Sequence, residues 1–129
     1  MAHIRRAEVF IEWGRYEAAQ FDLDAAREVI ESRHMSNWRV AGDEAETRIL
    51  LEVRRARPDA AQAASVRWRA AGKVQSEDEL TDLRFGIIVA AAQGQWAQAK
   101  AQCEAALAMV KKGSPVRDVP VLTEGRLKV

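Results

Sequence analysis

The sequence predicts an all-α chain in which about six helices pair as antiparallel hairpins that stack in one direction. A short signature occurs twice, first where Gly14 is followed by Tyr16 and again where Gly94 is followed by Trp96. Small or apolar residues follow each aromatic residue at steps of three and four, which is typical of a tight turn and a closely packed helix. Glycine and proline are otherwise sparse and alanine is abundant, which favours helices over strands.

The first hairpin is predicted over about residues 1–33. Apolar residues recur at helical steps from Ala2 to Glu12, and Gly14 ends this helix. A second apolar stripe runs from Tyr16 to about residue 33. Because the turn between the two helices is only two or three residues long, they must be antiparallel neighbours.

The second hairpin is predicted over about residues 43–72. Asp43 is expected to cap its first helix, with Glu46 in the capping-box position three residues later. This helix stops before Pro58, because a residue that precedes proline avoids the helical region. The following helix is expected to end at Gly72.

The third hairpin is predicted over about residues 76–113, and the pattern Ser76-x-x-Glu79 is a capping box at its start. Residues 114–129 contain prolines and a glycine, so we expect an extended or flexible tail. Residues 1–113 are therefore expected to form one repeat domain.

Equivalent positions in the three hairpins have unequal spacing. When Pro58 is aligned with Tyr16 and Trp96, the interval from Tyr16 to Pro58 is slightly longer than the interval from Pro58 to Trp96. The middle hairpin diverges most, since proline replaces the aromatic residue.

With these features the chain resembles the tetratricopeptide repeat (TPR) family over about residues 2–112. The first unit matches the family pattern at Ala7, Phe10, Gly14, Tyr16, Ala19, Leu23 and Ala26. The third unit matches at Leu83, Ala90, Gly94, Trp96, Ala99, Cys103 and Ala106. The second unit keeps Ala61, with Pro58 and Ser65 as departures. Both intervals exceed the period of about 34 residues that the family usually has, and are closer to the longer, degenerate repeats of bacterial signalling and transcription-regulator arrays.

The resemblance implies a short right-handed superhelix whose first helices line an inner groove that binds peptides or protein surfaces. The register of the family places eight residues of this chain in that groove: Arg5, Glu8, Glu12, Glu46, Leu50, Arg54, Arg84 and Ile88. Their mixed charges would pair with charges of a partner, while Leu50 and Ile88 would supply apolar contact. The alternative that these charges form an ordinary solvated face remains open.

The four tryptophans have different expected roles. Trp68 and Trp96 lie on apolar stripes and are expected in the core, while Trp13 is placed to wedge between hairpins. Trp38 falls in the irregular segment 34–42, which makes it a candidate exposed aromatic anchor for a partner. Packing of Trp38 onto a neighbouring unit is the alternative.

A basic stretch raises the question of nucleic-acid binding. It comprises Arg48, Arg54, Arg55, Arg57, Arg67, Arg69 and Lys73. Phosphate binding needs such clusters, but these residues are spread over two helices and the net charge is only +1. We expect them to be solvated or paired within the chain, and nucleic acid is the less favoured partner.

Catalytic and cofactor-binding patterns find little support. His3 and His34 lack metal-ligand spacing, and Cys103 lies on a packed stripe where a thiol is inert. We therefore expect no enzyme, no cofactor and no metal. The single cysteine and the lack of a long apolar run favour a cytoplasmic protein with no membrane association.

The expected function is that of a protein–protein interaction or scaffold module. The alternative is a sensor or regulatory arm of a bacterial signalling or transcription regulator, which would bind a small ligand or a nucleic-acid-associated partner. The first helix begins without a cap and carries apolar residues that need cover. We therefore expect either self-association through the terminal hairpins or a fragment of a longer array.

Overall fold

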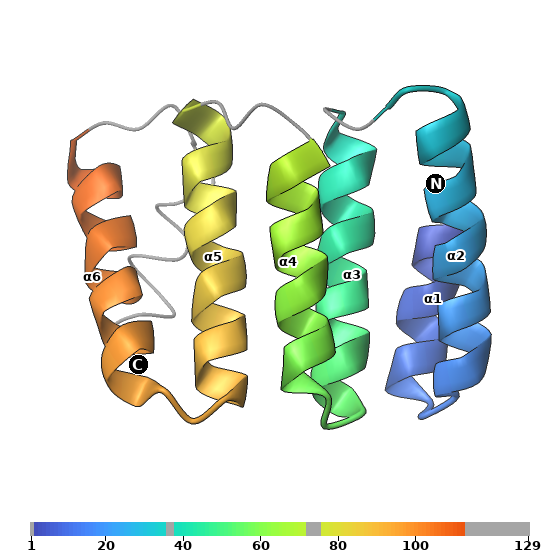
Figure 1. Ribbon diagram of the computed structural model, residues 1–129, viewed down its shortest axis with the longest axis horizontal. Helices are drawn as coiled ribbons and strands as arrows, with labels where there is room; N and C mark the ends of the chain where they lie inside the picture. The colour runs from blue at the N-terminus through green and yellow to red at the C-terminus, as the bar shows by residue number, and fades with distance from the viewer. Residues whose placement is uncertain (1, 36–37, 72–75, 113–129) are drawn as a thin grey trace. The chain divides into compact units, whose positions relative to one another are not determined.

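A computed structural model describes residues 2–35, 38–71 and 76–112, with the backbone alone for residues 76–78. This part of the chain contains six helices and no strand, which confirms the all-α prediction (Figure 1). The helices are α1 (Ala2–Glu12), α2 (Tyr16–Ser32), α3 (Arg39–Arg54), α4 (Pro58–Ala71), α5 (Ser76–Ala92) and α6 (Trp96–Lys111). The chain divides into a first unit, residues 1–73, and a second unit, residues 74–129, and each is described by itself.

All three hairpins turn through the same left-handed backbone conformation. The central residues are Gly14, Ala56 and Gly94, with φ angles of 74°, 58° and 76°. In each turn the next amide donates to a carbonyl five residues back, which is the Schellman arrangement. These bonds join Arg15 N to Phe10 O, Arg57 N to Glu52 O and Gln95 N to Ala90 O, each at 2.8 Å. The three turns repeat the unequal spacing that the sequence predicted, with the first interval the longer one.

The core of the first unit lies where α3 meets both helices of the first hairpin. Ala7 and Ile11 of α1, Ala19 and Leu23 of α2, and Leu51 of α3 form one buried cluster. The alanines let the helices approach closely, and Leu51 fills the space between α1 and α2. The α1–α2 and α3–α4 turns lie at the same end of this unit, so α1 and α3 are parallel (Figure 1).

The start of α3 differs from the prediction. The helix begins at Arg39 rather than Asp43, and Trp38 precedes it with an extended backbone and no side-chain cap hydrogen bond. The expected capping box is therefore not the start of this helix. Ala41 is already buried, so tertiary contact extends the helix through Gly42 despite a propensity cost of about 1 kcal/mol.

The second unit is the hairpin of α5 and α6. Phe85, Val89 and Ala90 of α5 are buried together with Ala99 of α6. A Cβ atom on Gly86 would lie 2.6 Å from the Gln102 side chain, so glycine permits the close approach of the two helices. The expected Ser76 capping box, the Gly72 cap and the tail 114–129 fall outside the residues or side chains that the structure describes.

Two tryptophan predictions need correction. Trp96 was expected in the core, but 69% of it is exposed, and Trp68 is only half-buried. Tyr16, the counterpart of Trp96, packs against a cluster that Leu51 of the next hairpin completes. In the described part of the chain no further helix follows α6 to cover Trp96 in the same way.

Candidate functional site

The predicted groove residues of the first unit lie on the outward sides of α1 and α3. Arg5, Glu8, Glu12, Leu50 and Arg54 are exposed, and Glu46 is half-buried. Arg54 Nη2 lies 3.5 Å from Glu12 Oε1, which shows that the exposed edges of α1 and α3 meet at this pair. The structure therefore brings these two predicted groove residues together.

The register of α1 against α3 follows from that pair. Glu12 stands two positions before Gly14, and Arg54 stands two positions before Ala56, so the pair joins equivalent positions of the two hairpins. In parallel helices this register places Leu50 one turn below Arg54, level with Glu8. Leu50 is 42% exposed, so it offers apolar surface between charged neighbours.

Val9 is an exposed apolar residue that the sequence pattern did not assign to the groove. It is 45% exposed. The signal was present, because Val9 falls outside the stripe formed by Ile4, Ala7 and Ile11. We define the α1–α3 face by its residues: Arg5, Glu8, Val9, Glu12, Glu46, Leu50 and Arg54.

Two further exposed aromatic residues flank the helices of this unit. Trp38, the candidate anchor, is 62% exposed directly before α3, which favours the anchor over the packed alternative. Trp13 was expected as a wedge between hairpins, but it is 67% exposed at the end of α1. Trp13 directly follows Glu12, the last residue of α1.

The remaining predicted groove residues, Arg84 and Ile88, lie on α5 and so belong to the second unit. Arg84 is exposed, and its guanidinium carbon lies 5.9 Å from the centroid of the Phe85 ring. Ile88 is half-buried.

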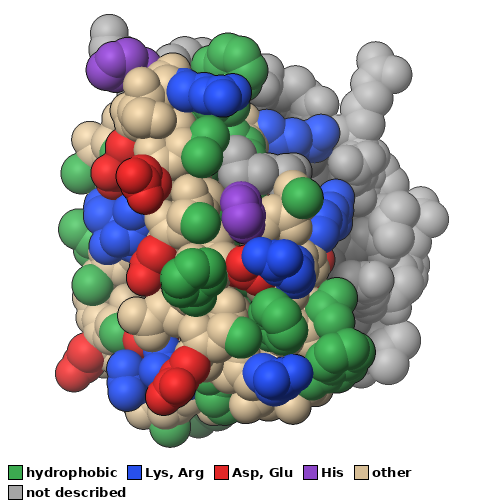
Figure 2. Space-filling view, turned by 90° about the vertical axis from the view of Figure 1, so that its right-hand side faces the viewer, with side chains coloured by type: hydrophobic (Ala, Val, Ile, Leu, Met, Phe, Trp, Pro, Cys, Tyr) green, Lys and Arg blue, Asp and Glu red, His purple; other side chains and the backbone are tan. Residues whose placement is uncertain are grey.

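Three residues of the basic stretch, Arg48, Arg54 and Arg55, have acidic or amide partners, and Arg67 is exposed. Arg54 pairs with Glu12, while Arg55 lies 3.3 Å from Glu52 and donates to Gln20 at 2.6 Å. Figure 2 shows the side of the first hairpin, where cationic, anionic and hydrophobic side chains alternate without an extended area of one charge. This pattern suits a protein surface better than a phosphate backbone.

A buried carboxylate ties α1 to α2. Asp22 is 1% exposed and accepts two hydrogen bonds from Arg6, at 2.8 and 2.6 Å. His3 Nδ1 lies 3.5 Å from the same carboxylate. The hydrogen bond from Arg6 lowers the pKa of Asp22, against the opposing effect of burial. This cluster is structural, since its acidic group is inaccessible and its main partner is already engaged.

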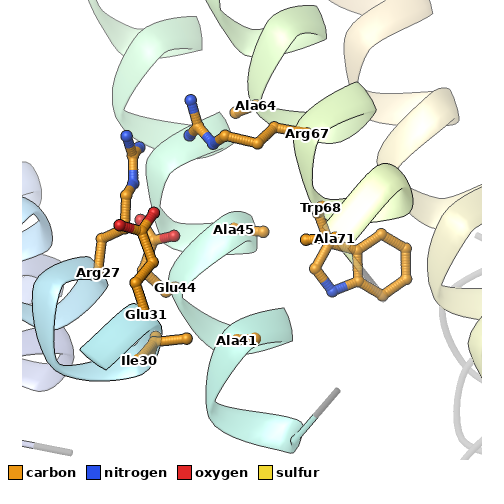
Figure 3. Close-up of a pocket in the computed structure, with 10 residues that line it drawn as sticks. All are labelled: Arg27, Ile30, Glu31, Ala41, Glu44, Ala45, Ala64, Arg67, Trp68 and Ala71. Atoms are coloured by element: carbon orange, nitrogen blue, oxygen red, sulfur yellow. The ribbon is translucent and has the colours of Figure 1, made fainter. Parts of the chain in front are cut away.

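A pocket that the sequence did not indicate lies between α2, α3 and α4 of the first unit (Figure 3). Its volume is about 60 Å³. One end is charged and the other is apolar. The charged end carries Arg27, Glu31, Glu44 and Arg67, and the apolar lining consists of Ile30, Ala41, Ala45, Ala64, Trp68 and Ala71.

The charges at this end are unevenly paired. Arg48, which is buried beside the pocket, binds Glu44 at 2.7 Å and Asp24 at 3.0 Å. Arg27 Nε is buried and donates no hydrogen bond to the described residues. Burial lowers the pKa of Arg27, and the nearby cations Arg48 and Arg67 lower it further. An unmade hydrogen bond of this kind costs about 1–3 kcal/mol.

The three arginines of this region come from three different helices, so their sequence positions gave no signal of convergence. Arg27 lies on α2, Arg48 on α3 and Arg67 on α4. Each has the spacing of an ordinary surface charge within its own helix. Only the packing of α3 against α2 and of α4 against α3 brings them to one place.

In the described part of the chain, no group of three or more His, Cys, Asp or Glu residues is arranged to hold a metal ion. No described helix has both the length and the apolar character needed to cross a membrane. Cys103 is a free thiol, half-buried on α6. No protein-family model matches the chain, and comparisons with curated proteins and with solved structures also return no match.

Proposed function

We propose that this chain is a protein–protein interaction module that binds a peptide or protein surface through the α1–α3 face. The observation that carries the proposal is the exposure of Val9 and Leu50 among charges of both signs. Apolar contact surrounded by paired charges gives a partner both affinity and a fixed orientation. The proposal includes hairpins that stack as a TPR-like right-handed superhelix in a cytoplasmic protein without catalytic activity.

The charges of this face are available to a partner. Glu12 and Arg54 form the pair that joins α1 to α3, yet their side chains are 70% and 52% exposed. Exposed ion pairs contribute about 0–1 kcal/mol to stability. A partner can therefore exchange this pair for its own charges at little cost to the fold.

Other predicted contact residues extend the proposal. Trp38 is proposed as an aromatic anchor because a large exposed aromatic residue is typical of binding hot spots. Arg84 and Ile88 are proposed to contact the partner from α5. Nucleic acid is not part of the proposal, since the basic residues Arg48, Arg54 and Arg55 already have acidic or amide partners.

The test is affinity capture from a lysate of the source organism, followed by quantitative mass spectrometry. The test variant carries Glu12→Arg with Arg54→Glu, which conserves net charge and keeps an attractive pair on the face. The matched control carries Glu28→Arg with Arg33→Glu, which reverses two exposed charges on or beside α2. Leu50→Ala removes the apolar contact separately.

We expect the test variant and Leu50→Ala to lose the same proteins, and the control to retain them. Circular dichroism should show equal helix content in all four chains, because every changed residue is exposed. Recovery of an identical set of proteins with the wild type and with the Glu12–Arg54 reversal would show that the α1–α3 face is not the binding surface.

A further inference from the structure

We propose that the pocket between α2, α3 and α4 binds a carboxylate joined to a short apolar chain. The carboxylate oxygens accept hydrogen bonds from Arg27 and Arg67, and the chain lies against Trp68 and the alanines of the lining. This site is separate from the α1–α3 face, so it goes beyond the interaction function proposed above.

The first support is the arrangement of the two guanidinium groups. Arg27 and Arg67 line the same end of the pocket, and the Arg67 side chain reaches across it toward Arg27 (Figure 3). Neither arginine forms an ion pair with a described residue, and Arg27 Nε is a buried donor without an acceptor. Planar guanidinium groups match the two oxygens of a carboxylate better than any other cationic side chain does.

The second support is the local charge. Arg48 already holds the carboxylates of Glu44 and Asp24. Glu31, which is exposed, is then the remaining pocket carboxylate that faces two arginines. The three arginines and the carboxylates of Asp24, Glu31 and Glu44 sum to zero net charge, so a bound anion takes the place of the exposed Glu31 carboxylate at Arg27 and Arg67. A singly charged anion adds less uncompensated negative charge to this region than a phosphate dianion does.

The third support is the size and lining of the pocket. A volume of about 60 Å³ holds a group of roughly four to six non-hydrogen atoms. Short alanine side chains at Ala41, Ala45, Ala64 and Ala71 leave this room, and the Trp68 ring closes one side. A carboxylate with two or three further carbons satisfies both the polar end and the apolar end. Such a group occurs in free short-chain acids and in the last residue of a peptide.

The test is a titration of the full chain with butyrate, followed by NMR of the Arg Nε–H, Trp indole N–H and backbone amide signals. We expect saturable shifts at Arg27, Arg67 and Trp68. Butanol, which has the same chain without the charge, and inorganic phosphate are the matched probes and should bind at least about tenfold more weakly, the difference made by one charge-assisted hydrogen bond.

Three variants test which side chains determine the affinity for butyrate. Arg67→Gln should weaken butyrate binding about tenfold, because it removes one charge-assisted donor from an exposed side chain that the fold does not need. Glu31→Gln should tighten binding, because the competing carboxylate is gone. Arg33→Gln, outside the pocket, should leave the affinity unchanged.

The two sources of the carboxylate are separated by a peptide that ends in Val-Ala with a free carboxylate, compared with its C-terminal amide. Binding of the free-carboxylate peptide alone identifies a chain terminus as the ligand, whereas binding of butyrate without the peptide identifies a free acid. The proposal is overturned if neither butyrate nor the free-carboxylate peptide gives a saturable shift at Arg27, if phosphate binds equally well, or if Glu31→Gln weakens binding.

Discussion

Ala56 occupies a backbone position that glycine holds in the other two hairpins, so Ala56→Gly should stabilise the first unit. The φ angle of Ala56 is 58°, against 74° for Gly14 and 76° for Gly94. A residue with a Cβ atom pays about 1–2 kcal/mol in this left-handed region. Glycine also raises the entropy of the unfolded chain, which lowers the free energy of unfolding by about 0.4–1 kcal/mol. Because Ala56 is exposed, its methyl group contributes little packing.

The net expectation for Ala56→Gly is about 0.5–1 kcal/mol of added stability. Gly14→Ala is the matched control in the same unit, and it should destabilise by about the same amount. A Cβ atom at Gly14 would meet nothing within 4 Å, so its effect comes from the backbone alone.

The assay is urea unfolding followed by circular dichroism, with thermal unfolding as a second measure. The midpoint should rise for Ala56→Gly and fall for Gly14→Ala at an unchanged slope m. The melting temperature should move by about 3–5 °C per kcal/mol in each direction. The reasoning predicts that the left-handed backbone favours glycine by about the same free energy in both hairpins. A lower midpoint for Ala56→Gly, or an unchanged midpoint for Gly14→Ala, would refute it.

Three further outcomes follow from the first unit. Gly42→Ala should raise the free energy of unfolding by about 0.5–1 kcal/mol in urea titrations, because Gly42 is helical and a Cβ atom there meets its nearest neighbour at an ordinary 3.8 Å. Asp22→Asn should cost about 1–3 kcal/mol, because an amide cannot accept both hydrogen bonds from Arg6. The folded-state pKa of Asp22 is lowered, so its contribution is present above the unfolded value of about 3.9 and disappears as the pH falls through the folded value. Unfolding titrations below pH 4 should therefore show a flatter pH dependence for Asp22→Asn. Arg48→Met should cost about 3–5 kcal/mol in the same titrations, because it leaves the buried Glu44 without its cation.

The helices and hairpin turns could be predicted because their signals are local. Gly14 and Gly94 mark left-handed turns, and the apolar steps of three and four mark the helices between them. The turn between α3 and α4 has no glycine to mark it. Its left-handed residue is Ala56, which carries a Cβ atom and adopts this conformation only within the folded hairpin. The start of α3 was missed for a related reason: burial of Ala41 against other helices outweighs the local preference for a cap at Asp43.

Some features of the candidate site could likewise be predicted from the sequence, and others depend on tertiary packing. Periodicity placed Glu12 and Arg54 on outward helix faces, but their pairing depends on how α3 packs against α1. Exposure of Val9 follows from its angle on α1, whereas the convergence of Arg27 and Arg67 requires three packed helices. Sequence patterns determine which face of a helix a residue occupies, and tertiary packing determines what it meets.

Neighbours in space within the first unit are also neighbours along the chain. α2 lies against α1, α3 against both of them, and α4 against α3. Proteins rich in such local contacts fold in microseconds to milliseconds. During synthesis, Leu23 can meet Ala7 and Ile11 before Leu51 has left the ribosome, and Leu51 then docks on a hairpin that already exists. The order of translation is therefore also an efficient order of assembly, in which each new helix finds its template already in place.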